Sequence, residues 1–116
     1  MSKIIRTEAT AILSKAVEYH GFVFTQGIVT QDSSLDIAGQ TRDVLEQIDQ
    51  VLEHHGTDKT RLLQAQIWLK HISDRVALNE VWSAWLAEGQ APARALVQAE
   101  LADAKWLVEI MVTTCK

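Results

Sequence analysis

The sequence predicts an α+β domain in which a mixed β-sheet carries two helices packed on one of its faces. The main observation is that the spacing of apolar residues switches between the two-residue period of strands and the three-to-four-residue period of helices. The chain also has a single proline, Pro92, and no low-complexity stretch or obvious repeat, so residues 1–116 are expected to form one domain without a linker. A chain of this length buries roughly two-thirds of the surface that its unfolded form exposes, which is enough for one hydrophobic core.

The first half of the chain predicts a β-hairpin followed by a long helix. Residues 16–29 are rich in Val, Phe and Ile, and the His-Gly pair at 20–21 is typical of a tight turn between two strands. From Ser33 onward the apolar residues recur every three or four positions, which indicates an amphipathic helix of about twenty residues. Ser33 and Asp36 can cap the start of this helix, and Gly56 can provide a left-handed residue at its end.

The second half predicts a strand, a shorter helix and two closing strands. The first of these strands alternates in hydrophobicity, and its expected buried face consists of Leu63, Ala65, Ile67 and Leu69. A helix is expected to begin at Ser73 or Asp74 and to end at Gly89, with an apolar side formed by Leu78, Val81, Trp82 and Trp85. Two strands are expected at 93–101 and 105–114. The order of elements is therefore ββ, α, β, α, ββ, arranged in two layers.

The last predicted strand is unusual because both of its faces are apolar. Leu107 and Met111 flank Glu109 on one face, and the other face consists of Trp106, Val108, Ile110 and Val112. In a two-layer domain the helices cover one sheet face, so we expect a partner chain to cover the other. The sequence therefore predicts an oligomer.

Glu109 is the candidate functional residue of this strand. A carboxylate among apolar neighbours must be paired, protonated or hydrogen-bonded, because burying an idealised ion costs on the order of 20 kcal/mol. The preceding predicted strand offers Arg94 as a partner, with Leu96 and Gln98 along the same face. In one interpretation Arg94 and Glu109 form a structural ion pair, or both lie in water at strand ends. In the other, Arg94 binds a substrate carboxylate through two parallel hydrogen bonds, and Glu109, with a pKa raised by apolar surroundings, acts as a base for water.

Composition and charge argue against several other classes of protein. The net charge is −4, and the eleven Lys and Arg residues are scattered, so we expect no nucleic-acid partner. The sequence contains no apolar stretch suited to a signal peptide or a membrane span, and we therefore expect a cytoplasmic protein with no membrane partner. The lone Cys115 can form neither an internal disulfide nor a zinc knuckle, so no metal site is expected.

The histidines and one glycine are weaker candidates for a site. Adjacent His54 and His55 diverge on a helix and cannot hold one metal, so we expect both at a solvated helix end. His20 and His71 have no Ser or Cys partner at a recognisable spacing, and a catalytic triad is not expected. Gly27 permits a close approach of its backbone to a ligand, although a turn at a strand end explains it equally well.

Several local strings are similar to those of one protein family. They are FVFTQG at 22–27, QTRDVL at 40–45, NEVW at 79–82, APAR at 91–94 and VEI at 108–110. Together they resemble the Rid (YjgF) family of reactive intermediate deaminases over nearly the whole chain, and the fifteen residues from Arg94 to Glu109 match the spacing in that family. The resemblance implies a chorismate-mutase-like α+β fold and a homotrimer with a barrel-like centre, whose sites lie between neighbouring subunits.

The resemblance also implies a chemistry. Rid deaminases hydrolyse reactive 2-imino and enamino acids, such as 2-iminobutanoate and 2-iminopropanoate, to 2-oxo acids and ammonia without a cofactor. Carried across by position, Arg94 would bind the substrate carboxylate and Glu109 would orient or deprotonate the attacking water. The backbone near Gly27 and Leu96 would line the pocket.

The sequence departs from the family pattern at several positions, and Leu96, for example, stands where a cysteine is common. Deaminases of the family usually have a Pro-Tyr pair near the end of the N-terminal segment, where this chain has Ile12-Leu13 and therefore lacks the tyrosine hydroxyl. A second hypothesis follows, in which the protein binds or senses a small carboxylate such as a 2-oxo acid without turning it over. Some relatives are described as endoribonucleases, but the acidic charge and the missing basic stripe argue against that activity here.

Overall fold

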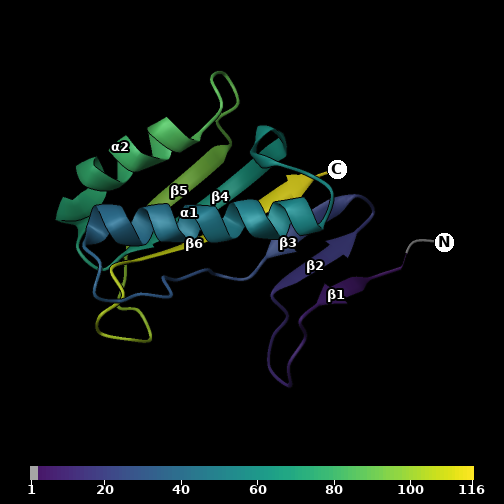
Figure 1. Cartoon of the computed structure of the whole chain (residues 1–116), viewed down its shortest axis with the longest axis horizontal. Helices are drawn as coiled ribbons and strands as arrows, with labels where there is room; N and C mark the ends of the chain where they lie inside the picture. Colours follow the sequence, from purple (N-terminus) through teal and green to yellow (C-terminus); the bar gives the residue numbers. More distant parts are fainter. Residues whose placement is uncertain (1–2) are drawn as a thin grey trace.

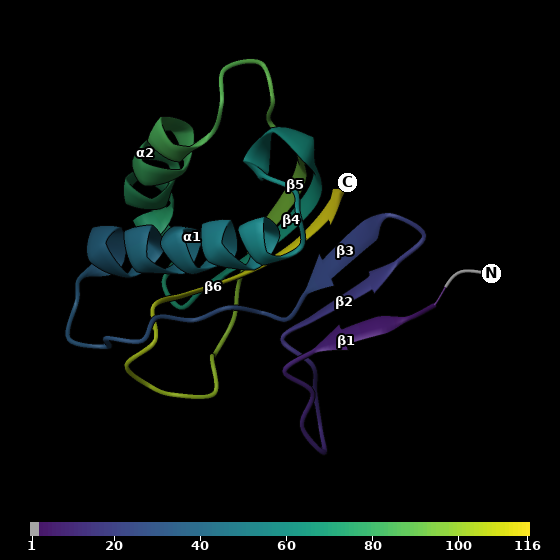
Figure 2. The same ribbon diagram turned by 45° about the vertical axis from the view of Figure 1, so that its right-hand side comes forward.

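In the computed structural model, which describes residues 3–116, six strands form one sheet and two α-helices lie on one of its faces (Figures 1 and 2). In chain order the elements are β1 (Ile5–Thr7), β2 (Ala16–Tyr19), β3 (Phe22–Thr25), α1 (Ile37–His54), β4 (Leu62–Leu69), α2 (Arg75–Trp85), β5 (Ala93–Gln98) and β6 (Val108–Cys115), with short 3₁₀ turns at Lys59–Arg61 and Ile72–Asp74. The strand order is β1-β2-β3-β6-β4-β5; β4 and β5 are parallel, and the other neighbours are antiparallel. The predicted α+β class and mixed sheet are confirmed. No helix within residues 3–116 is long and apolar enough to cross a membrane.

Three details of the elements differ from the sequence prediction. Strand β1 was not predicted, because its three residues are largely exposed and show no alternation. Helix α2 ends at Trp85, where Leu86 turns to an extended conformation, and Gly89 lies beyond it with a left-handed φ of 74°. The last two strands are shorter than expected, because residues 99–107 form a long connection between them.

Strand β4 contains an irregularity near its start, and one side chain there points to the sheet face opposite to the one expected. The pairing of β4 with β6 shifts register between Leu62 and Gln64. As a result Leu62 is buried, with 7% of its surface exposed, whereas the expected core residue Leu63 is 43% exposed. Such a bulge places an extra residue in one strand and therefore breaks the simple alternation.

Helix α1 supplies much of the core. Its start is capped by Asp36, whose Oδ1 accepts a hydrogen bond from the Gly39 amide at 2.8 Å. Beyond its end, Gly56 has a φ of 73° and its amide donates to the carbonyl of Glu53, as predicted for a left-handed cap. The stripe that faces the sheet is fully or almost fully buried and consists of Val44, Leu45, Ile48, Val51 and Leu52.

A buried glutamine connects α1 to the start of β6. The side-chain amide of Gln40 donates to the carbonyls of Leu35 and Lys105, each at 3.1 Å. Its Oε1 accepts from the amide of Leu107 at 2.9 Å. Because Leu107 directly precedes β6, this side chain helps to fix the position of the strand that carries Glu109.

The face of the sheet opposite the helices is open in a single chain. Phe24, Val97 and Met111 point to this face and are 45%, 45% and 40% exposed. Exposed apolar side chains on one face are typical of an interface. The expected cover by a partner chain remains a prediction.

Candidate functional site

Glu109 lies near the start of β6, between residues that face the core. Val108 and Ile110 are buried beneath the helices, so alternation directs Glu109 to the open face, as predicted. Its carboxylate is partly buried, and no side chain or backbone group of residues 3–116 pairs with it or hydrogen-bonds to it. Loss of water around the carboxylate raises the pKa of Glu109 above its ordinary value.

Gly27 lies directly against this carboxylate. A Cβ atom at position 27 would lie 2.0 Å from Glu109 Oε2 and 2.9 Å from its carboxyl carbon, so no other residue fits here without displacing Glu109. The neighbouring residue Ile28 exchanges two backbone hydrogen bonds with Ile110, at 2.8 and 3.0 Å, which fixes the two segments side by side. The close approach of the Glu109 side chain therefore explains the glycine, and Gly27 and Glu109 form one part of a candidate site.

Arg94 forms a second cluster, on the edge strand β5. Its Nη1 donates to Oδ1 of Asn79 at 2.7 Å, and its guanidinium lies 5.7 Å from the ring centre of Trp82; both partners are on α2. Partial burial lowers the pKa of Arg94 from its ordinary value, but a guanidinium stays protonated in proteins. Asn79 and Trp82 thus hold a positive charge at the rim of the helix layer.

Arg94 and Glu109 do not meet within one chain, which corrects their expected pairing. Strand β4 lies between β5 and β6, and Arg94 is level with Ala65, whereas Glu109 is level with Trp68. The offset is three residues, or about 10 Å along the strands. Ala65 faces the helices, so Arg94 is on the helix side and Glu109 is on the open side. The structural ion pair is therefore wrong for a single chain.

Leu96 follows Arg94 on the helix side of β5. Its side chain packs against the core and is level with Ile67. Any role of Leu96 in binding would therefore use its backbone, which lies at the free edge of the sheet. The family resemblance likewise implies that the backbone near Leu96 lines the pocket.

The histidine pair at the end of α1 behaves differently from the prediction. His54 is exposed, as expected, but His55 is only 6% exposed. Its Nδ1 lies 3.0 Å from Oε1 of Glu18, and its Nε2 lies 3.1 Å from the hydroxyl of Thr7. No local pattern predicts this cluster, because its three members come from β1, β2 and the residue directly after α1.

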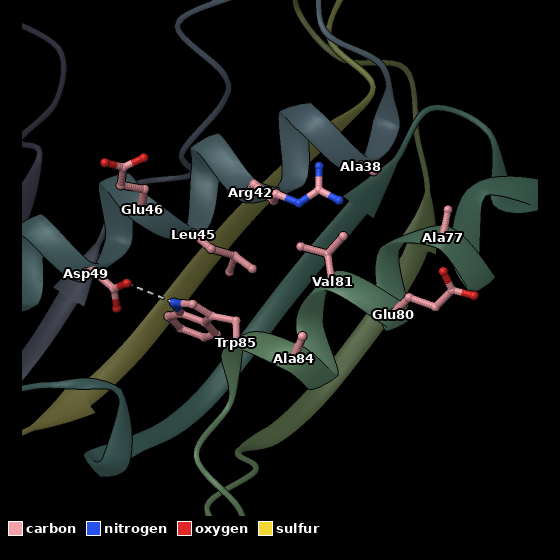
Figure 3. Close-up of a pocket in the computed structure, with 10 residues that line it drawn as sticks. All are labelled: Ala38, Arg42, Leu45, Glu46, Asp49, Ala77, Glu80, Val81, Ala84 and Trp85. Atoms are coloured by element: carbon pink, nitrogen blue, oxygen red, sulfur yellow. Dashed lines mark hydrogen bonds between the residues drawn. The ribbon is translucent and has the colours of Figure 1, made fainter.

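A groove between the two helices is the other concave feature near α2. It has a volume of about 430 Å³. Small and apolar side chains of α1 and α2 line it together with the charged side chains of Arg42, Glu46, Asp49 and Glu80 (Figure 3). Across its floor, Nε1 of Trp85 donates to Oδ2 of Asp49 at 3.0 Å. None of Gly27, Arg94, Leu96 and Glu109 lines it. Within residues 3–116, no group of three His, Cys, Asp or Glu side chains is arranged to hold a metal ion.

Comparison with known proteins places the chain in a family. The family model described as Endoribonuclease L-PSP matches residues 4–115. The crystal structure of a member of the YjgF protein family from Neisseria meningitidis has a TM-score of 0.93 and 42% sequence identity, covering 98% of this chain and 95% of that one. The chain belongs to the YjgF (Rid) family.

Other relatives match over almost their full length. A RutC family protein of Haemophilus ducreyi is 38% identical over 110 residues, which cover 95% of this chain and 94% of the relative. The RutC family protein YoaB of Escherichia coli is also 38% identical, over 109 residues. An uncharacterised Pseudomonas aeruginosa protein of known structure has a TM-score of 0.96 at 38% identity and covers 98% of this chain. The YjgF (Rid) fold thus extends over the whole described chain.

Proposed function

We propose that this YjgF (Rid) protein is a deaminase that hydrolyses small 2-imino or enamino acids to 2-oxo acids and ammonia. The observation that carries the proposal is Glu109, an unpaired and partly buried carboxylate packed against Gly27. A structural carboxylate would be paired or fully solvated, because leaving it desolvated without a partner costs free energy. Such an arrangement is typical of a functional group.

The chemistry of Glu109 suits a general base. A raised pKa makes a carboxylate a stronger acceptor for a proton of water than an ordinary glutamate is. In the proposed reaction the water oxygen bonds to the imine carbon while Glu109 takes one of its protons. Return of that proton to nitrogen gives a carbinolamine. Transfer of its hydroxyl proton to the same nitrogen, again through Glu109, then breaks the carbon–nitrogen bond and gives a 2-oxo acid and ammonia. Base assistance of this kind typically contributes about 10²–10⁴ in rate.

Arg94 suits the substrate carboxylate. Asn79 occupies only one of its five N–H donors, which leaves others for a two-point contact with a carboxylate. The Trp82 ring supports the guanidinium plane. No cofactor is required by this mechanism, since hydrolysis of an imine consumes only water.

The two halves of the site come together when neighbouring copies pack. Arg94 lies at the β5 edge on the helix side, and Glu109 lies on the open face, so packing the edge of one copy against the open face of the next can join them. Exposed Phe24, Val97 and Met111 on the open face support such packing. A head-to-tail contact that closes into a ring is consistent with the homotrimer that the family resemblance implies.

The test is the release of 2-oxo acid from imines that an amino-acid oxidase generates in the assay. Wild type should accelerate release over the spontaneous rate, and Arg94→Ala or Glu109→Gln should reduce the acceleration about 10²-fold or more. Asn79→Ala serves as a control of intermediate effect, because Arg94 keeps its charge but loses the hydrogen bond that orients it. Release at the spontaneous rate with wild type, across precursors of different size, would refute the deaminase.

A second function is favoured by the N-terminal segment. Leu13 takes the place of the family tyrosine and is 46% exposed, so it offers no hydroxyl to a reaction. The alternative is a module that binds or senses a 2-oxo acid without turnover. Calorimetry with pyruvate and 2-oxobutanoate distinguishes the two: saturable binding that needs Arg94, with no imine hydrolysis, supports the module, and absence of binding counts against it.

A further inference from the structure

A series of hydrogen bonds joins Thr7, His55 and Glu18, none of which belongs to the proposed deaminase site. The Thr7 hydroxyl lies 3.1 Å from His55 Nε2, and His55 Nδ1 lies 3.0 Å from Glu18 Oε1. A hydroxyl, an imidazole and a carboxylate in this order, joined through the two ring nitrogens, have the geometry of a nucleophile, its base and the group that orients the base.

The ionisation of Glu18 determines which groups donate and which accept in these hydrogen bonds. The hydrogen bond from His55 and the nearby ammonium of Lys116, whose Nζ is 3.3 Å from Oε2, lower the pKa of Glu18. The carboxylate can then only accept, so Nδ1 of His55 must carry the proton. In the neutral ring Nε2 is consequently an acceptor, and Thr7 donates its hydroxyl proton to it.

The hydroxyl and the base also differ in access to solvent. The side chains of His55 and Glu18 are 4% and 16% exposed, which shields the hydrogen bond between them from water. Thr7 lines two shallow pockets, of about 290 and 390 Å³, that border the end of α1; Lys15 and His54 line the first, and Lys116 lines the second. These volumes lie at the small end of the range for ligand sites.

The backbone next to Thr7 is strained. Glu8 has a φ of 47°, in the left-handed region that non-glycine residues rarely adopt. Such conformations cost about 1–3 kcal/mol and cluster at functional sites. A purely structural anchor for β1 could be built from apolar side chains without this strain and without a hydroxyl.

We infer that Thr7 is a nucleophile that accepts small acyl groups from activated esters or thioesters. The Thr7 oxygen forms a bond to the acyl carbon, and its proton moves to His55 Nε2. The carbon–oxygen or carbon–sulfur bond to the leaving group then breaks, and the leaving group takes the proton from His55. The product is an acyl ester of Thr7, and water attacking by the same route releases the acid and restores the hydroxyl. Glu18 is a positioning residue that holds the reactive tautomer of His55.

The inference is tested with p-nitrophenyl acetate on the full chain carrying Cys115→Ser, which removes the thiol that would compete for this probe. Mass spectrometry of peptides should locate an acetyl group on Thr7, with an initial burst of p-nitrophenolate that matches the amount of acetylated Thr7. Thr7→Val, which keeps the shape of the side chain, should abolish this labelling, and Thr7→Ser should retain it. His55→Gln should slow it at least about tenfold.

Two comparisons separate catalysis from support of the fold. Glu18→Gln should slow labelling and Glu18→Asp should recover part of the rate, although both leave a side chain that can bond to His55. Thr60→Val is the matched control, because the Thr60 hydroxyl bonds to Asp58 and has no imidazole partner. Acetylation confined to lysines, or Thr7 labelling at the same rate in His55→Gln with an unchanged melting temperature, would overturn the inference. Neither outcome depends on imine hydrolysis, so the deaminase proposal is tested separately.

Discussion

At the scale of single residues, the free energy of ionising Glu109 links the proposed function to the stability of the fold. Its pKa is raised by desolvation in the folded chain, so folding favours the protonated form. The penalty is absent below the unfolded pKa of about 4.3, grows as the pH rises from there to the folded pKa, and is constant above it. Ionisation of this carboxylate in the folded chain therefore reduces stability, which is the expected cost of keeping a base without a partner.

Glu109→Gln should accordingly raise the melting temperature at pH 7–8 and lose this advantage below about pH 4, where wild-type Glu109 is protonated. Parallel thermal melts of both proteins across this range measure the difference. Glu46→Gln, on the exposed side of α1, is the control and should show no such trend. A variant that is less stable than wild type at pH 8 would mean that an unseen partner stabilises the charge. In the deaminase assay, wild-type activity should fall as the pH drops through the raised pKa.

The sequence predicts some residue-level features of the site and misses others for clear reasons. The two-residue period alone places Glu109 on the face opposite Val108 and Ile110, and the structure confirms it. The contact between Gly27 and Glu109 depends on the register of the Ile28–Ile110 bridge, which local patterns do not encode. His55 was misassigned because its partners Thr7 and Glu18 come from distant strands.

At the scale of elements, the position of β6 depends on polar contacts as well as apolar packing. Gln40 is fully buried, and all its side-chain hydrogen bonds reach backbone groups in the segments before α1 and β6. Removing such a side chain leaves buried backbone groups unpaired, at about 1–3 kcal/mol each.

Gln40→Met, which preserves length and volume, should therefore lower the free energy of unfolding by about 2–4 kcal/mol. Urea denaturation monitored by circular dichroism provides the measurement. Gln47→Met is the matched control on the same helix: its amide bonds to Val29 and Asp43, but the residue is only partly buried, so the loss should be smaller. Equal losses in the two variants would contradict the role assigned to Gln40.

The order of the strands shows where element-level prediction fails. Periodicity identifies β2 to β6, but it does not determine which strands are neighbours. Because β4, α2 and β5 form a parallel crossover unit, β5 pairs with β4 and not with β6. The expected proximity of Arg94 to Glu109 assumed that successive strands pair, and the insertion of β4 between them separates the two residues.

At the scale of the whole molecule, one chain holds its candidate site residues in two separate places. The open face of the sheet holds Glu109 and Gly27 among exposed apolar side chains, and the far edge holds Arg94 against α2. We therefore expect a neighbouring copy that covers the apolar sheet face also to complete the proposed site.

Mixing two inactive variants tests directly whether Arg94 and Glu109 act from different chains. An Arg94→Ala chain keeps Glu109, and a Glu109→Gln chain keeps Arg94. A contact restores an intact site when the Glu109→Gln chain supplies Arg94 and the Arg94→Ala chain supplies Glu109. With random assembly of equal amounts in a head-to-tail ring, about a quarter of the contacts should be intact, and activity should recover to about that share of wild type. The assay is imine hydrolysis, or calorimetric binding of 2-oxobutanoate if wild type binds without turnover.

The control mixture combines Arg94→Ala with the double variant Arg94→Ala/Glu109→Gln, which supplies no Arg94 in any chain and should stay inactive. Both mixtures are unfolded and refolded together, and light scattering verifies that subunits have reassembled. Recovery only in the first mixture requires that Arg94 and Glu109 act from different chains. If neither mixture recovers although the subunits have exchanged, the two residues do not share a site between copies, and the roles assigned to them under the deaminase proposal fail together.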